Sequence, residues 1–338
     1  MARRPRGDRP GAWHHVVNRA IARRPYFETR SDQRYFLAQL AAEVRSGRIE
    51  VHAFCLMTTH FHLLVRSPLG ELSEGMRRVQ YRYARKFNRL RRRDGPLIRA
   101  RFFSKRADTV LYRRTIVRYI DINPVRAGLV RTGAEYEFGS ARAYVSGKTP
   151  PWLTTDWIRE HALELTGRRR FSSRVYLQAY GPRDTQDINS LCSFVERRMG
   201  SSRDRDPLED LVGSTPRQVR EWMRRKAVLA DGHEVGLPVC GVPSLISAIE
   251  GDLERGGEWI VDQRGRAWRG SELARVALLR TLCSATWAEV ASMTGWTVNL
   301  VRRRSREHRE AMKRDHRHVE RVERIAIAAV RSTAAIRS

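Results

Sequence analysis

The sequence has few cysteines, no long apolar run and far fewer acidic than basic residues, and each shortage excludes a class of protein. Its four cysteines, Cys55, Cys192, Cys240 and Cys283, lie far apart without CxxC spacing, which argues against a zinc knuckle or a disulfide framework. No stretch approaches the roughly 18 apolar residues of a membrane span, and the N-terminal residues lack the apolar core of a signal peptide. We therefore expect a cytoplasmic protein.

The basic excess is the first positive signal. The 338 residues include 65 Lys and Arg against 37 Asp and Glu, for a formal net charge of +28. Such a charge favours a polyanionic partner, with nucleic acid as the default. A high-GC genome, which enriches arginine everywhere, is the alternative, although the basic residues here also cluster. The 41% hydrophobic content supports packed cores, and the length predicts about two domains with room for a third small one.

The first 150 residues alternate between strand and helix patterns. Predicted strands cover 13–18, 50–57, 60–66 and 101–106, and predicted helices run from a cap at Ser31-Asp32 to Gly47, over 72–90 and over 109–123. The short link Thr58-Thr59 favours an antiparallel hairpin. This order predicts an α+β domain in which one antiparallel sheet, ferredoxin-like in outline, carries helices on one face.

The remaining chain reads as mainly helical. Thr149-Pro150-Pro151 marks a boundary, and we predict three parts: a domain at 1–150, a helical connector at 151–224 and a second domain at 225–338. The tail after Lys313 is basic and helix-prone, and we expect it to fray.

A helix-turn-helix pattern lies inside the third part. Thr286 is placed to cap one short helix, Gly295 to make a tight turn, and Thr297 to cap a second helix with a basic outer face. In a helix-turn-helix this second helix enters the major groove, so Arg302 and Arg303 are predicted DNA contacts. Any small helical bundle with a glycine turn is the alternative.

The motif His60-Phe61-His62 lies within an apolar run over 54–65. Strand side chains alternate, so the two histidines share one face and Phe61 points into a core on the other. The pattern offers two imidazoles to one metal ion at the lip of a sheet. A purely structural pair is the alternative, since two ligands alone do not make a metal site.

A second candidate segment is Arg118-Tyr119-Ile120-Asp121-Ile122-Asn123-Pro124. Tyr119 and Asn123 are four residues apart and share one face of a helix, so a phenol and an amide oxygen can both face the sheet lip. Asn123 is a candidate third ligand. Without the histidines, Tyr119 would more often be a packed aromatic.

Basic residues near these motifs suggest a surface that tracks phosphates. The predicted DNA contacts are Arg77, Arg78, Arg82, Arg85, Lys86, Arg101, Lys105 and Arg106, together with the run Arg91-Arg92-Arg93. Ordinary solvated arginines are the alternative for at least half of these positions. Tyr83 and Phe87 have the helical spacing of core residues.

These motifs together resemble the single-tyrosine HUH transposases, in particular the REP-associated tyrosine transposases of bacteria. The resemblance covers about residues 11–145 and is carried by His14-Val16-Asn18-Arg19, by 54–65, by Arg99-Arg101-Phe102-Phe103 and by 119–130. The His-hydrophobe-His strand and the Tyr-Ile-x-x-Asn-Pro helix, in this order, are its specific part. Thr58-Thr59 stands where relatives often carry Pro-Asn or Pro-Glu, which leaves the histidines in place. His14 matches the motif; for His14, His15 and His52 a structural role competes with one beside the site.

The resemblance implies the HUH endonuclease fold and a mechanism. Tyr119 would attack a phosphodiester of single-stranded DNA, leaving a 5′-phosphotyrosine and a free 3′-hydroxyl, while His60, His62 and Asn123 hold Mg²⁺ or Mn²⁺. Rejoining would need no ATP, and no glycine-rich phosphate loop is present. Hairpin-forming repeats are the expected substrate and the bacterial nucleoid the expected location; both monomers and homodimers are compatible. The C-terminal part loosely resembles the DNA-binding domain of the bacterial replication initiator and would add duplex binding.

Two other functions stay open. One is a non-catalytic DNA-binding regulator that keeps the scaffold, and intact His60, His62, Tyr119 and Asn123 speak against it. The other is a rolling-circle replication initiator or plasmid relaxase, which the lack of a helicase P-loop disfavours.

Overall fold

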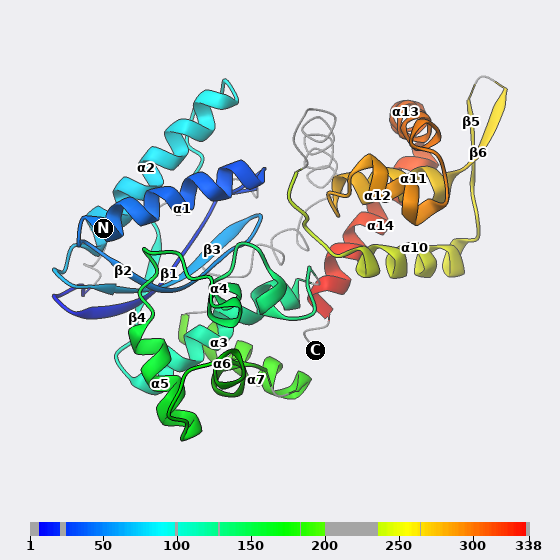
Figure 1. Ribbon diagram of the computed structural model, residues 1–338. Coiled ribbons are helices and arrows are strands. Elements are labelled where there is room, and N and C mark those ends of the chain that lie inside the picture. The colour runs from blue at the N-terminus through cyan, green and yellow to red at the C-terminus, as the bar shows by residue number, and fades with distance from the viewer. Residues whose placement is uncertain are drawn as a thin grey trace. The chain divides into compact units, whose positions relative to one another are not determined.

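The computed structural model describes residues 7–20, 25–98, 101–127, 129–182, 184–199, 236–263 and 265–335 (Figure 1). The chain divides into two compact units. The first unit comprises Met1–Val125 and Val130–Pro207, and the second comprises Arg126–Leu129 and Leu208–Ser338. The domain boundaries predicted near residues 150 and 224 stay predictions.

The first unit is built on a four-stranded antiparallel sheet. Its strands are β1 (Ala12–Arg19), β2 (Glu50–Leu56), β3 (His60–Ser67) and β4 (Phe103–Arg106), in the order β2-β3-β1-β4. With the helices between them the element order is that of a ferredoxin-like unit. The predicted hairpin at Thr58-Thr59 and the predicted α+β class are confirmed.

Helices α1 (Arg30–Arg45) and α2 (Leu72–Leu90) cover one face of this sheet. Phe61 of β3 is fully buried there against Phe36 of α1, at 4.9 Å between ring centroids, and Tyr83 of α2 packs on Phe36 at 5.4 Å. The cap predicted at Ser31-Asp32 is wrong by two residues. Thr29 is the N-cap, and Asp32 completes a capping box three residues later.

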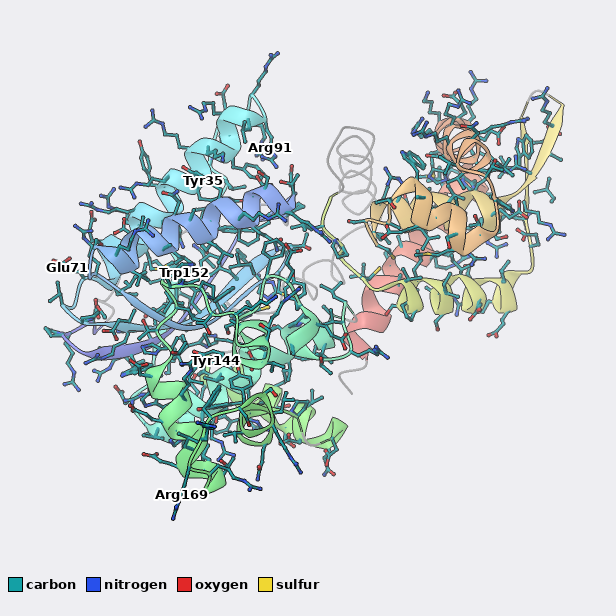
Figure 2. All side chains as sticks on the ribbon, in the orientation of Figure 1. Tyr35, Glu71, Arg91, Tyr144, Trp152 and Arg169 are labelled. Carbon is teal, nitrogen blue, oxygen red and sulfur yellow. The ribbon has the colours of Figure 1, made fainter. Side chains whose placement is uncertain are left out.

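The opposite face is covered as well, so the prediction of helices on one face only is wrong. Helix α3 (Val110–Arg126) packs there through Tyr119, and α4 (Ser140–Ser146) through Tyr144, whose hydroxyl donates to the carbonyl of His52 at 2.7 Å. Figure 2 shows Tyr144 and Tyr35 on opposite sides of the sheet. The physical reason is that seven of the eight residues of β3 are buried, which requires cover on both faces.

The described part of the first unit also contains a short 3-10 turn before α4 and three helices after α4. Its remaining elements are η2 (Gly133–Glu135), α5 (Asp156–Thr166), α6 (Ser173–Tyr180) and α7 (Thr185–Met199). Tyr176 of α6 stacks on Tyr144 at 4.8 Å and donates a hydrogen bond to Asp121 of α3 at 2.6 Å. Burial raises the pKa of Asp121 to about 7. These helices therefore brace the segment that carries Tyr119.

The second unit is largely helical and contains one hairpin. Its elements are α10 (Val242–Gly256), β5 (Ile260–Gln263), β6 (Arg266–Arg269), α11 (Gly270–Thr281), α12 (Trp287–Thr294), α13 (Val298–Arg314) and α14 (His316–Ala335). The prediction of a frayed tail is wrong, because α14 packs on α10 around a buried pair of Arg321 and Asp252 at 2.7 Å. No helix in the described part of the chain is long and apolar enough to cross a bilayer.

The local signals around α12 and α13 have the predicted form. Thr286 caps α12 in a capping box with Glu289, Gly295 adopts a φ of +71° at its end, and Thr297 caps α13. The left-handed conformation at Gly295 is one that glycine adopts without steric cost. That the pair forms a DNA-binding helix-turn-helix stays a prediction.

Candidate active site

Strand β3 places His60 and His62 on the same face of the sheet. Their ring centroids lie 4.8 Å apart with the ring planes at 89°, and the residues are 1% and 4% exposed. Phe61 between them points to the aromatic core on the other face. The alternation of strand side chains thus separates two polar rings from the core within three residues.

Each imidazole is held through its Nδ1 atom. The hydroxyl of Thr59 lies 3.1 Å from Nδ1 of His60, and Nε2 of His15 lies 3.1 Å from Nδ1 of His62. Histidines that bind metals usually have their second ring nitrogen hydrogen-bonded in this way, because the contact fixes the ring and its tautomer. The arrangement therefore suits ligation through the two Nε2 atoms.

His15 of β1 is one of the three histidines for which the sequence left open a structural role or a role beside the site. It is fully buried, its ring stacks on that of His62 at 5.3 Å, and its Nδ1 has no hydrogen-bond partner within the described residues. Burial lowers the pKa of His15 to about 3, so the ring is neutral at physiological pH. The spacing of β1 alone could not reveal the contact, since it depends on how β1 and β3 are paired.

His14, which carries the sequence motif, lies on the other face of β1. Its ring nitrogens contact the hydroxyl of Ser104 at 2.9 Å and the carboxylate of Asp8 at 3.1 Å. Burial lowers the pKa of His14, and Asp8 opposes that effect. His52 packs against Trp13 at 4.2 Å. Both therefore have structural surroundings away from the paired imidazoles.

Tyr119 of α3 packs directly on the histidine face. Its ring centroid lies 5.3 Å from that of His62, with the planes at 87°, and 5.9 Å from that of His15. The residue is 4% exposed. Tyr119 thus meets His62, which lies 57 residues earlier in the sequence, and His15, which lies 104 residues earlier.

Asn123 lies one helical turn after Tyr119 and is 3% exposed. Its side-chain nitrogen donates to the carbonyl of Tyr119 at 2.7 Å. That bond assigns the amide oxygen as the atom with which Asn123 would ligate an ion.

The donor set fits a divalent ion that keeps open positions. Within the described residues there is no group of three or more His, Cys, Asp or Glu side chains able to hold a metal. An ion here would rest on the imidazoles of His60 and His62, with oxygens from Asn123, water or a DNA phosphate completing its shell. Mixed imidazole and oxygen ligation suits Mn²⁺ and tolerates Mg²⁺.

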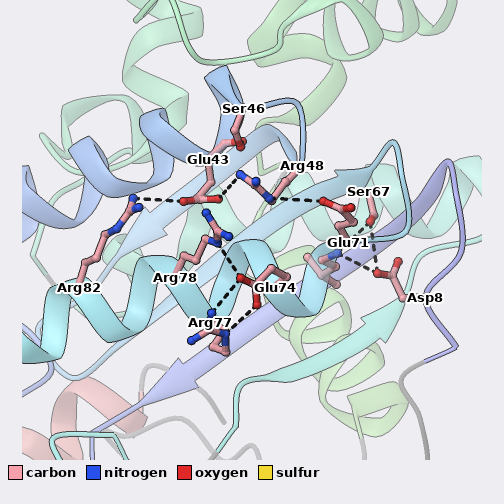
Figure 3. Close-up of polar contacts among 11 residues, drawn as sticks. Asp8, Glu43, Ser46, Arg48, Ser67, Glu71, Glu74, Arg77, Arg78 and Arg82 are labelled. Atoms are coloured by element: carbon pink, nitrogen blue, oxygen red, sulfur yellow. Dashed lines mark hydrogen bonds and ion pairs between the residues drawn. The ribbon is translucent and has the colours of Figure 1, made fainter.

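The arginines predicted on α2 are mostly committed to neighbouring carboxylates (Figure 3). Glu74 accepts from Arg77 at 2.7 Å and from Arg78 at 2.6 Å, and these bonds lower the pKa of Glu74 to about 2. Glu43, on α1, accepts from Arg82 at 3.2 Å. The spacing of Glu74 three and four residues before the arginines was a usable sequence signal.

Further along α2 the predicted contacts differ from one another. Lys86 lies over the ring of Tyr35 at 3.8 Å, whereas Arg85 is exposed and makes no ion pair with any described residue. Arg91 is a structural residue, which corrects its assignment to a phosphate-tracking run. Arg91, which is labelled in Figure 2, pairs with Glu28 at 2.7 Å and Asp32 at 2.6 Å.

The remaining predicted contacts divide in the same way. Arg101 and Lys105 are exposed, whereas Arg106 pairs with Asp108 at 2.6 Å.

On α13, Arg302 is exposed and Arg303 pairs with Glu307 at 3.1 Å. Arg99 lies outside the described residues.

Comparisons with known proteins find similarity for the N-terminal third of the chain. Residues 10–123 match the family model described as "Transposase IS200 like". A solved structure described as "Structure of the REP associates tyrosine transposase bound to a REP hairpin" is similar over 46% of this chain and 92% of that chain, at 21% identity and a TM-score of 0.37. A likeness of that degree supports no conclusion by itself. The comparison with curated proteins finds no match.

Proposed function

Residues 10–123 are an IS200-like transposase domain, and from this premise we propose that the chain nicks and rejoins single-stranded DNA through Tyr119. The observation that carries the proposal is the packing of the Tyr119 ring 5.3 Å from His62, on the face that also holds His60. A phenol beside paired imidazoles is the arrangement needed for attack on a phosphate neutralised by a metal ion.

The covalent step conserves the phosphodiester energy. The Tyr119 oxygen forms a bond to phosphorus, the bond to the 3′ oxygen breaks, and the phenol gives up its proton while the leaving oxygen gains one. The products are a 5′-phosphotyrosine and a free 3′-hydroxyl. Another 3′-hydroxyl can reverse the step, so strand transfer needs no nucleotide cofactor.

His60, His62 and Asn123 are the residues that would hold Mg²⁺ or Mn²⁺. When bound, the ion polarises the phosphate oxygens and contributes several kcal/mol to transition-state stabilisation. Among the chain's own residues, Thr59 orients His60 and His15 orients His62. A neutral His15 that accepts the Nδ1 proton of His62 leaves the Nε2 lone pair for the ion and adds no competing charge.

His60, His62 and Tyr119 are each at most 4% exposed. A phosphate between Tyr119 and the imidazoles needs room that side chains occupy in this state. DNA binding is therefore coupled to opening of the site.

Exposed basic residues are the first candidates for DNA contacts. Arg85, Arg101 and Lys105 can bind phosphates without giving up an ion pair to any residue that the structure describes. Arg77, Arg78, Arg82 and Arg106 would exchange a carboxylate partner for a phosphate, and Lys86 an aromatic ring, so their net gain is smaller. A hairpin formed by a single strand is the proposed substrate, and α13 with Arg302 is the proposed duplex contact.

A labelled single-stranded hairpin oligonucleotide incubated with Mn²⁺ tests the activity. Wild-type protein should form a covalent adduct that survives a denaturing gel, and Tyr119→Phe and His60→Ala should each abolish it. Binding without any adduct in the wild type would instead favour the non-catalytic DNA-binding regulator.

A further inference from the structure

We propose that the β5–β6 hairpin is a second duplex-DNA contact, held beside α13 so that both elements bind the same duplex. The inference rests on the proposed function, in which α13 binds duplex DNA. It adds an element that no sequence motif indicated, and it assigns that element a partner by its charge and its place in the second unit.

The hairpin is anchored at its base. Trp259 precedes β5 and is 1% exposed, and its carbonyl accepts a hydrogen bond of 2.7 Å from the backbone of Gly270, which follows β6. A Cβ atom at Gly270 would lie 1.9 Å from the Trp259 ring, so only glycine fits there. The indole N–H of Trp259 donates to buried His318 at 3.1 Å. Both ends of the hairpin are thus fixed to the helical core.

The hairpin is also held along one flank of α13. Trp268 of β6 lies beneath two guanidinium groups, with Arg304 at 3.8 Å and Arg303 at 5.4 Å from its ring centroid. Glu307 accepts from both arginines, at 3.0 and 3.1 Å. Cation–π contacts backed by ion pairs hold the strand against the helix more firmly than exposed contacts of either kind alone. Arg303 is therefore assigned to this junction, which refines its predicted role as a DNA contact.

The same helix has a different face open to solvent. Val301 and Ser305 are buried, and Arg303, Arg304 and Glu307 take the flank toward Trp268. At about 100° per residue, the remaining side carries Asn299, Arg302 and Arg306, all exposed. The guanidinium of Arg302 lies 6.0 Å from the ring of Trp287 in α12. The open stripe therefore runs between α12 and the hairpin.

The hairpin adds positive charge beside that stripe. Arg266 and Arg269 are both exposed and make no ion pair with any described residue. Arg266 shares the strand face of Trp268, and Arg269 lies on the other face. Asp262, on β5, is the acidic side chain nearest to them in the ladder, opposite Ala267.

Duplex DNA fits this surface better than a single strand does. Arg304 lies over the ring of the hairpin's Trp268 at 3.8 Å, so an unpaired base would have to displace that guanidinium to stack on this face. A helix in the major groove leaves the phosphates at the groove edge within reach of an element on its flank. Two arginines there would hold register on the duplex without reading sequence.

The test is a salt titration of duplex binding by the full chain, measured by fluorescence anisotropy with a labelled random-sequence duplex. Each phosphate contact contributes about 0.9 to the slope of log affinity against log salt concentration. The double variant R266Q/R269Q should therefore bind more weakly and lose about 1.8 from that slope. A labelled single strand should show a smaller loss.

Matched variants separate the outcomes. R169Q/R170Q removes the same charge from two exposed residues between α5 and α6 (Figure 2 labels Arg169) and should leave the slope unchanged. An equal loss in that control, an unchanged slope in R266Q/R269Q, or an equal loss on single strands would each overturn the inference. The double variant R302Q/R306Q tests α13 itself. If it lowers the salt slope of duplex binding while R266Q/R269Q does not, only the hairpin contact is rejected. If neither double variant lowers the slope, duplex binding by α13 is rejected as well. Thermal melts monitored by circular dichroism verify that every variant is folded.

Discussion

Two histidine pairs, one in each unit, make nearly the same contact in different surroundings. In the sheet, Nε2 of His15 lies 3.1 Å from Nδ1 of His62, and in the second unit Nδ1 of His308 lies 3.0 Å from Nε2 of His318. In the second unit Trp259 completes the chain. Its indole N–H can only donate, so Nδ1 of His318 accepts and Nε2 of His318 carries the proton donated to His308.

The sheet pair has no such obligatory donor within the described residues, because Nδ1 of His15 has no partner there. Either ring can therefore supply the shared proton. That freedom is what a ligand histidine needs, since His62 must carry its proton on Nδ1 when Nε2 binds an ion. The difference teaches that the group at the end of a hydrogen-bond chain, more than the histidine contact itself, decides between a packing role and a ligand role.

The largest expected effect is on the covalent step, and it distinguishes the nucleophile Tyr119 from the metal-binding histidines. Tyr119→Phe should lower adduct formation by about 10³-fold or more, because the ring packing survives and the attacking oxygen does not. Mn²⁺ affinity, measured by calorimetry on the same variant, should stay within about twofold, since the phenol is not a proposed ligand. A large fall in Mn²⁺ affinity would show that Tyr119 belongs to the metal site.

The next effect tests the orienting role of His15. His15→Leu should raise the Kd for Mn²⁺ by about 10- to 100-fold, because the Nδ1 proton of His62 loses its acceptor. His15→Gln keeps an acceptor oxygen and should recover part of that affinity. His318→Leu changes the matching pair in the second unit and should not alter Mn²⁺ binding; equal losses from both leucine variants would erase the proposed distinction.

A smaller effect is expected on the pH dependence of stability, through the pair His308 and His318. Burial lowers the pKa of His308 to about 3 and that of His318 to about 4, below their ordinary value near 6.5. Below pH 6.5 the unfolded chain takes up protons that the folded unit does not. Stability is therefore fully present above pH 6.5 and is lost on acidification, by at most about 1.4 kcal/mol per pH unit for each histidine.

Urea unfolding monitored by tryptophan fluorescence at pH 7, 6 and 5 measures this slope, and these pH values span the window in which only the unfolded state titrates. His308→Phe removes one of these groups and should lower the slope by up to about 1.4 kcal/mol per pH unit. An unchanged slope would mean that His308 is not buried as a neutral ring.

Helix ends and turns could be predicted from the sequence because they depend on residues that are neighbours in the chain. Thr286, Gly295 and Thr297 delimit two helices through caps and a turn that involve neighbouring residues. The charge partner of Arg77 and Arg78 was also within reach, since Glu74 lies on the same helix. Arg91 was not, because its partners Glu28 and Asp32 lie 63 and 59 residues away.

The sequence by itself determined that His60 and His62 share a face, because alternation along a strand is a property of the backbone. It also determined that Tyr119 and Asn123 share a side of a helix. Only the tertiary structure decided that α3 covers the histidine face, that His15 meets His62 across 47 residues, and that α14 packs on α10. Those contacts depend on strand register and on which apolar surfaces are buried together, and neither leaves a periodic signal in the chain.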